Sequence, residues 1–226
     1  MTTFSEQFPI VFQALNIGFL QTLKLFFVTL IGAIPLGLII SFGSMSSWTP
    51  LGFLRPLLKN LPKNTKLTWW QRFQIWCYVD FKPIRIIVRF IIWVVRGTPL
   101  MLQLLAVTYG PYYLFELPVS RNKLIPVVIA FAINYAAYFA EIYRGGIESM
   151  PVGQYEAAEV LGYTKVQTFI HVILPQVFKR IMPSITNEVV TLVKDTSMAF
   201  TVSYQEMFTI GKQIAVSYTH LTLPTT

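Results

Sequence analysis

The stretch LFFVTLIGAIPLGLIISFG, residues 25–43, contains no charged side chain. Two further stretches share this property, GTPLMLQLLAVTYGPYYLF at 97–115 and LIPVVIAFAINYAAYFA at 124–140. As helices, runs of this length reach roughly 25–30 Å, which is close to the thickness of a bilayer's hydrocarbon core. Of the 226 residues, 54% are hydrophobic and only 12% are charged, so the composition departs from soluble averages. The sequence therefore predicts an all-α polytopic membrane protein.

The net charge of +8 is distributed as expected for a membrane protein rather than a nucleic-acid-binding protein. Nine Lys and Arg residues lie between positions 44 and 96, with Asp80 as their only acidic companion. The connection between the second and third predicted spans holds two basic residues, Arg121 and Lys123. The positive-inside rule places 44–96 in the cytoplasm, and the alternating spans then return residues 144–175 to the same side.

A long cytoplasmic insert is expected at residues 44–85. Within it, LTWWQRFQIWCYVDF at 67–81 places Trp69, Phe73 and Trp76 at helical spacing between basic residues. This pattern predicts an amphipathic helix at the cytoplasmic interface, with tryptophans at headgroup level. Simple packing against neighbouring helices is the alternative interpretation. The only cysteine, Cys77, excludes an internal disulfide.

The stretch GQYEAAEVLGYTKVQTFIHVILP, residues 153–175, is more typical of a soluble helix–turn–helix. Pro151 suits a first helical position, and Gly162 suits a left-handed helix end. Thr164 and Gln167 form a capping-box pattern that begins a second helix, which Pro175 is expected to stop. Gly145 and Gly146 are expected to bend the chain into this region.

The first of these two helices is expected to expose Glu156 and Glu159, while Ala157 and Ala158 keep its flank narrow. A charged helix with a small-residue flank is shaped to dock into a partner.

The fourth predicted span, about 181–206, carries a polar face at spacings of three, four and seven residues. Its members are Asn187, Glu188, Thr191, Lys194 and Asp195. A charge inside the membrane costs roughly 2.5–3.5 kcal/mol, so this face should meet a cavity or the interior of a bundle. A zwitterionic amino acid would offer its ammonium to Glu188 or Asp195 and its carboxylate to Lys194. Alternatively, these groups pair with one another and fasten a subunit interface.

A second group of candidates surrounds Arg96-Gly97-Thr98-Pro99. Pro99 should disturb the start of a helix, and Thr98 or Gln103 could restore the lost hydrogen bonds or line a path. Asn134, Tyr135 and Tyr138 in the third span could face the same path, but hydrogen bonding between helices is an equal alternative.

Together these motifs resemble the permease subunits of ATP-binding-cassette (ABC) importers. Glu156-Ala157-Ala158, Gly162 and Leu174-Pro175 match the EAA loop of that family. Three segments are similar to the polar amino-acid branch of that family: AEIYRGGIESMPVGQYEAAEVLG, VRGTPLMLQ upstream of it and LVKDTSMAF downstream of it. The resemblance covers most of residues 10–212, with three motifs in the correct order. It implies a type I importer transmembrane domain of about five spans, in a bacterial inner membrane, with the EAA loop cytoplasmic.

The resemblance also implies the partners and the roles of individual residues. The partners would be an ABC ATPase dimer, a second permease subunit, an extracytoplasmic amino-acid-binding protein and the lipid bilayer. The ATPase-coupling residues would be Gly153, Glu156, Ala157, Ala158 and Gly162. The substrate path would be lined by Arg96, Thr98, Gln103, Asn187, Glu188, Thr191, Lys194, Asp195, Thr196 and Ser197.

No catalytic role, cofactor or metal is expected for this chain. It contains no GxxxxGK[ST] phosphate loop, so ATP hydrolysis would belong to a partner. An ion-coupled secondary transporter is the alternative function, in which Glu188, Lys194 and Asp195 would carry ions. That class favours inverted repeats and broken helices in both halves, and no such repeat is evident. A membrane scaffold would not need a charged stripe within a span.

Two features depart from the family pattern. The insert of about 40 residues between the first two spans is longer than expected for the family. The tail VSYTHLTLPTT, residues 216–226, shows no apolar period or helix signal and resembles a non-native extension. The transmembrane domain is therefore expected to cover 1–215, with its last span truncated.

Overall fold

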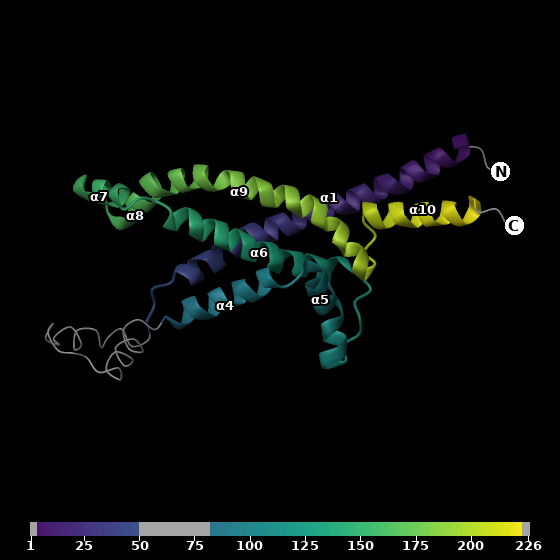
Figure 1. The fold of residues 1–226 in the computed structure, drawn as a ribbon, viewed down its shortest axis with the longest axis horizontal. Coiled ribbons are helices and arrows are strands. Elements are labelled where there is room, and N and C mark those ends of the chain that lie inside the picture. The colour runs from purple at the N-terminus through teal and green to yellow at the C-terminus, as the bar shows by residue number, and fades with distance from the viewer. Residues whose placement is uncertain (1–3, 50–81, 223–226) are drawn as a thin grey trace.

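The computed structural model describes residues 4–49 and 82–222, and within these ranges the ordered elements are all helical (Figure 1). The predicted interfacial helix at 67–81 lies outside the described residues. The helices are α1 (Phe4–Met45), α4 (Pro83–Gly97), α5 (Leu100–Phe115), α6 (Leu124–Glu148), α7 (Val152–Val160), α8 (Lys165–Gln167), a π-helical turn η3 (Thr168–Ile173), α9 (Leu174–Asp195), a 3-10 segment η4 (Thr196–Val202) and α10 (Met207–Thr222).

Helix α6 lies at the centre of the bundle and packs along α1. Phe131, Tyr135 and Phe139 of α6 are buried together with Leu25 of α1. Gly37 permits this close approach, because a Cβ atom at that position would lie 2.8 Å from the Cβ of Phe139. Small residues at such crossings are typical of membrane helices. The core is therefore a contact between the first and third predicted spans.

Two of the described helices, α1 and α6, are long and apolar enough to cross a membrane, and a third span exists if α4 and α5 count together. Helix α9 does not meet the same criterion because it carries Lys179, Arg180, Glu188, Lys194 and Asp195. Its charges require partners or a polar cavity.

The second span is not the single helix expected over 97–115. Helices α4 and α5 meet at 105°, with the break at Thr98 and Pro99. Proline lacks a backbone N–H, and its ring disfavours helical geometry in the preceding residue. Thr98 is accordingly extended, with φ −106° and ψ 139°. The arginines of α4 therefore belong to one arm of a bent helix pair.

The prediction that Pro175 stops a helix is wrong. The chain widens into the π-helical turn η3 and continues directly into α9, where Pro175 occupies one of the first two positions. Pro175 has no backbone N–H to donate. The wider turn before it and its early position in α9 both make this missing donor less costly.

The fourth predicted span also differs, because the α-helix runs over Leu174–Asp195 and the chain then reverses after η4. Glu206 is buried and accepts hydrogen bonds from the backbone N–H groups of Phe208 (2.6 Å) and Thr209 (2.7 Å), which caps α10. Residues 216–222 continue α10, so the expectation of no helix there is wrong. The non-native origin of the tail stays a prediction.

The contact at Gly37 predicts a measurable difference between two glycines of α1. Gly37→Ala should lower the temperature of unfolding, since overpacking a tight contact costs about 1–3 kcal/mol. Gly32→Ala is the matched control, because its Cβ would lie 3.8 Å from the Cβ of Ala132, an ordinary contact. The gain in helix propensity is common to both. Heating detergent-solubilised protein and measuring the monodisperse fraction tests this; equal stability would contradict the packing.

Candidate functional site

A cavity of about 430 Å³ lies where α4, α5, α6 and α9 meet, and we call it the inner cavity. Its lining residues are Arg96, Gly97, Thr98, Pro99, Leu100, Asn134, Tyr135, Tyr138, Glu188, Thr191 and Asp195. Three segments far apart in the sequence therefore contribute: the helix break, the middle of α6 and the second half of α9.

The side chain of Gln103 stabilises the break between α4 and α5 by hydrogen bonds. Its side-chain amide donates hydrogen bonds to the carbonyl oxygen of Val95 (2.7 Å) and to the hydroxyl of Thr98 (2.8 Å). The Gln103 oxygen accepts a bond of 3.1 Å from the side chain of Asn134 in α6. These bonds satisfy backbone groups released by the missing helical turn, as the interior of a membrane requires. Thr98 and Gln103 thus restore lost hydrogen bonds, one of the two roles expected for them.

The opposite wall of the inner cavity is acidic. The hydroxyl of Tyr135 donates a 2.7 Å hydrogen bond to the carboxylate of Asp195. Glu188 and Thr191 lie on the same face of α9 and also line the cavity. From the α4 side comes Arg96, whose guanidinium stacks over the ring of Tyr138 at 5.0 Å from its centroid. The cavity therefore presents both charge signs, as recognition of a zwitterion requires.

The structure brings together only part of the predicted path. Arg96, Thr98, Glu188, Thr191 and Asp195 line the inner cavity, and Gln103 supports it. Four predicted residues are not among its lining residues: Asn187, Lys194, Thr196 and Ser197.

Lys194 is exposed, and Thr196 is buried with its hydroxyl donating to the carbonyl oxygen of Val193 at 2.7 Å. The hydroxyl of Ser197 donates to the carbonyl of Lys194 at 2.8 Å. Of the two basic residues predicted for the path, Arg96 lines the inner cavity and Lys194 does not. Helical spacing within one segment could not reveal a partner contributed by another helix.

The EAA segment forms a separate protrusion beyond the ends of α6 and α9 (Figure 1). In α7, Gly153, Glu156 and Ala157 are exposed, whereas Ala158 is buried. Gly162 has φ +78°, which confirms the predicted left-handed end, and both bonds of the capping box between Thr164 and Gln167 are present. Pro151 is the N-cap rather than the first helical residue.

Side-chain contacts fasten this protrusion to the long helices. Arg180 of α9 donates to the backbone carbonyl of Ser149 at 2.6 Å and to its hydroxyl at 3.0 Å. Gln176 of α9 donates to the side chain of Gln154 in α7 at 3.1 Å. Gly146 does not bend the chain, since α6 continues through Glu148, and it lets α6 approach Ile181 closely.

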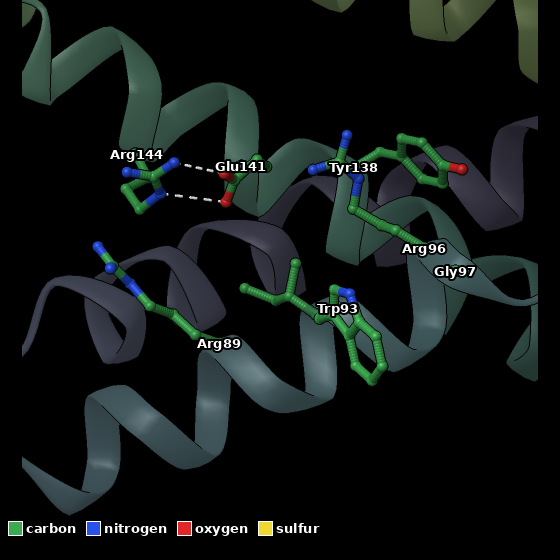
Figure 2. A pocket seen from close by; sticks show the side chains of 8 residues that line it. Arg89, Trp93, Arg96, Gly97, Tyr138, Glu141 and Arg144 are labelled. Atoms are coloured by element: carbon green, nitrogen blue, oxygen red, sulfur yellow. Dashed lines mark hydrogen bonds and ion pairs between the residues drawn. The ribbon is translucent and has the colours of Figure 1, made fainter.

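A second cavity, of about 450 Å³, lies between α4 and α6 beside the first; we call it the basic cavity. Figure 2 shows Arg89 and Arg96 reaching from α4 towards α6, where Glu141 and Arg144 pair with each other. Arg96 lines both cavities. Within residues 4–49 and 82–222, no group of three or more His, Cys, Asp or Glu side chains could hold a metal ion.

Comparison with known proteins gives concordant matches. Residues 75–217 match the family model described as the binding-protein-dependent transport system inner membrane component. The octopine transport system permease protein OccM of Rhizobium meliloti is 34% identical over 197 residues, which is 83% of this chain and 72% of that protein. The L-cystine transport system permease protein TcyB of Bacillus subtilis (strain 168) is 37% identical over 134 residues, 59% of this chain and 56% of that protein.

A solved structure of an amino acid ABC transporter with histidines matches with a TM-score of 0.72 and 29% identity, covering 96% of this chain and 86% of that one.

The hydrogen bonds of Gln103 predict the rigidity of the helix break. Gln103→Leu should broaden the distribution of angles between α4 and α5, because the carbonyl of Val95 loses its shorter hydrogen bond and the bond from Asn134 of α6 to the Gln103 side chain is lost. Spin labels at the exposed positions Ile87 and Tyr113 report the angle as a distance distribution. Leu102→Ala is the control, since it changes the neighbouring exposed side chain without touching the amide. An unchanged narrow distribution in Gln103→Leu would contradict this role.

Proposed function

This chain belongs to the family of inner-membrane components of binding-protein-dependent transport systems, and on that premise we propose that it forms the translocation path of an ATP-driven amino-acid importer. The observation that carries the proposal is the inner cavity, in which Arg96 lies across from a wall containing Glu188 and Asp195. An amino acid carries a carboxylate and an ammonium, and this lining offers a partner for each. The transported compound is thus an amino acid or a derivative that keeps both groups.

The chemistry of the cavity suits transient binding. Arg96 offers a planar set of donors that matches a carboxylate, and its stacking on Tyr138 fixes the guanidinium without occupying those donors with an acidic partner. Asp195 already accepts a bond from Tyr135, which leaves acceptor capacity for an ammonium. These are charge-assisted hydrogen bonds, which are stronger than neutral ones.

We further propose that α7 couples this path to a separate ATPase. Glu156 projects from an exposed helix whose neighbours Val160 and Leu161 are also exposed, at 88% and 73%. Such an apolar, acidic surface is suited to burial against a partner. Because Arg180 and Gln176 fasten this region to α9, displacement of α7 would be passed to the helix that carries Glu188 and Asp195.

The proposed orientation of the protein in the membrane rests on the distribution of its basic residues. The basic beginning of α4 and the helix α7 lie at the same end of the molecule, opposite the ends of the described chain (Figure 1). The positive-inside rule assigns that end to the cytoplasm, where the ATPase is expected. A second permease subunit and an extracytoplasmic amino-acid-binding protein complete the proposed importer.

The cavity assignment is tested by uptake of radiolabelled amino acids into proteoliposomes containing the complete importer. Arg96→Gln should reduce uptake by about 10–150-fold, since a hydrogen bond to a charged group contributes about 1.5–3 kcal/mol. Lys194→Gln removes the same charge from an exposed position outside the cavity and should leave uptake near the wild-type value. The opposite pattern would show that Lys194, not Arg96, meets the carboxylate.

The coupling role is tested with Glu156→Lys in the same system. Losing one partner of a desolvated charge pair costs about 2–5 kcal/mol, so both uptake and substrate-stimulated ATP hydrolysis should collapse while the permease extracts as a folded protein. Gly162→Val should also impair coupling, because a β-branched residue resists the left-handed geometry. Glu116→Lys, after α5, is the control for charge reversal elsewhere. Wild-type uptake in Glu156→Lys would refute the role of α7.

A further inference from the structure

The basic cavity carries an excess of guanidinium groups. Arg89, Arg96 and Arg144 line it, and Glu141 is the only carboxylate among its lining residues. Arg144 donates to Glu141 at 3.1 Å and also pairs with Glu148, so each of its three nitrogens has a carboxylate partner. Glu141 and Arg144 therefore compensate each other and form a neutral section of the α6 wall (Figure 2).

The other two arginines keep free donors. Arg89 lies 3.6 Å from Glu148, but that carboxylate also serves Arg85 at 3.5 Å and Arg144. For Arg96, no carboxylate within the described part of the chain comes within 4.0 Å of the guanidinium, which stacks on Tyr138. Both side chains rise from α4 towards α6 (Figure 2). They lie seven residues apart, or roughly 10 Å along a helix, so they flank a site for an anionic group.

The surface around this site is apolar. Trp93 lines the cavity and is 70% exposed, and its neighbours Phe90 and Ile91 are 60% and 52% exposed. The rings of Phe90 and Trp93 lie 6.0 Å apart. Tryptophan in membrane proteins concentrates at the level of the lipid headgroups. Helix α4 thus offers a hydrocarbon surface directly beside cationic donors, a combination that a small hydrated anion would not use.

We propose that the basic cavity binds the phosphate headgroup of an anionic phospholipid from the leaflet that faces α7. The phosphate lies between Arg89 and Arg96, and the acyl chains follow the exposed face of α4 beside Phe90 and Trp93. Basic pockets between membrane helices on the cytoplasmic side are suited to such headgroups. The basic cavity shares Arg96, Gly97 and Tyr138 with the inner cavity, whereas Arg89, Ile92, Trp93, Glu141 and Arg144 line the basic cavity alone.

Lipid retention by the purified, delipidated full chain tests the proposal, measured by native mass spectrometry. Dioleoyl-phosphatidylglycerol should be retained about tenfold more strongly than dioleoyl-phosphatidylcholine, which has the same acyl chains but no net charge. Arg89→Gln should abolish this preference, and Arg89→Lys should keep most of it because the charge remains. Arg121→Gln, in the connection between α5 and α6, is the matched control and should behave as wild type.

Two further measurements test the apolar part of the site and its preference for a lipid over a soluble anion. Trp93→Ala removes an exposed side chain rather than a core one, so it should fold and still weaken retention of the anionic lipid. Inorganic phosphate should compete weakly, at millimolar concentration or above.

Four outcomes would overturn the proposal. In the first, Arg89→Gln is folded and retains the lipid normally. In the second, Arg121→Gln loses as much lipid as Arg89→Gln, which would indicate general attraction of charge. In the third, phosphate binds tightly without any lipid preference, which would indicate a soluble anion site. In the fourth, the lipid is lost whenever two copies associate, which would mean that a second copy covers the cavity.

Discussion

The structure depends on satisfying the backbone of a helix that breaks inside a membrane protein. Pro99 cannot continue α4, and the carbonyl of Val95 instead accepts hydrogen bonds from the side chains of Gln103 at 2.7 Å and Thr98 at 3.2 Å. The same amide side chain accepts a hydrogen bond from Asn134, so the break is fixed against α6. The 105° bend then turns Arg96 away from the line of α5. Both cavities that we describe lie beside this bend, since Arg96 and Gly97 line each of them.

The two cavities differ in how their charges are compensated. In the inner cavity, the acidic groups of α9 face a single arginine, and Tyr135 holds Asp195 by a neutral donor. The balance therefore leaves room for a ligand of both signs. At the basic cavity, Glu141 pairs with Arg144, and the nearby Glu148 is shared by Arg85, Arg89 and Arg144. The remaining donors of Arg89 and Arg96 therefore favour an anion. Helix α4 thus lines both the proposed amino-acid path and the proposed phosphate site.

Sequence patterns predicted local chemistry well and tertiary placement only in part. Gly162 and the pair Thr164–Gln167 were predictable because a left-handed helix end and a capping box each depend on residues a few positions apart. The polar face of α9 followed from helical spacing, and three of its five members do line the inner cavity. Of the two basic residues predicted for the path, only Arg96 lines the inner cavity, because α4 packs beside α6, and the helical period of α9 carries no information on that packing. Pro175 does not end the helix as predicted, because the chain forms a π-helical turn before it and continues directly into α9.

That π-helical turn has a mechanical consequence. Because η3 runs directly into α9, the chain from Thr168 to Asp195 is continuous helix, and its 22-residue α-helical part alone is roughly 33 Å long at 1.5 Å per residue. One end of this rod carries Gln176 and Arg180, which contact α7 and Ser149; the other carries Glu188 and Asp195, which line the inner cavity. A loop at Pro175 would separate the two ends mechanically, whereas a helix joins them. The coupling that we propose would therefore move the acidic wall relative to Arg96, which belongs to a different helix and stacks on Tyr138 of α6.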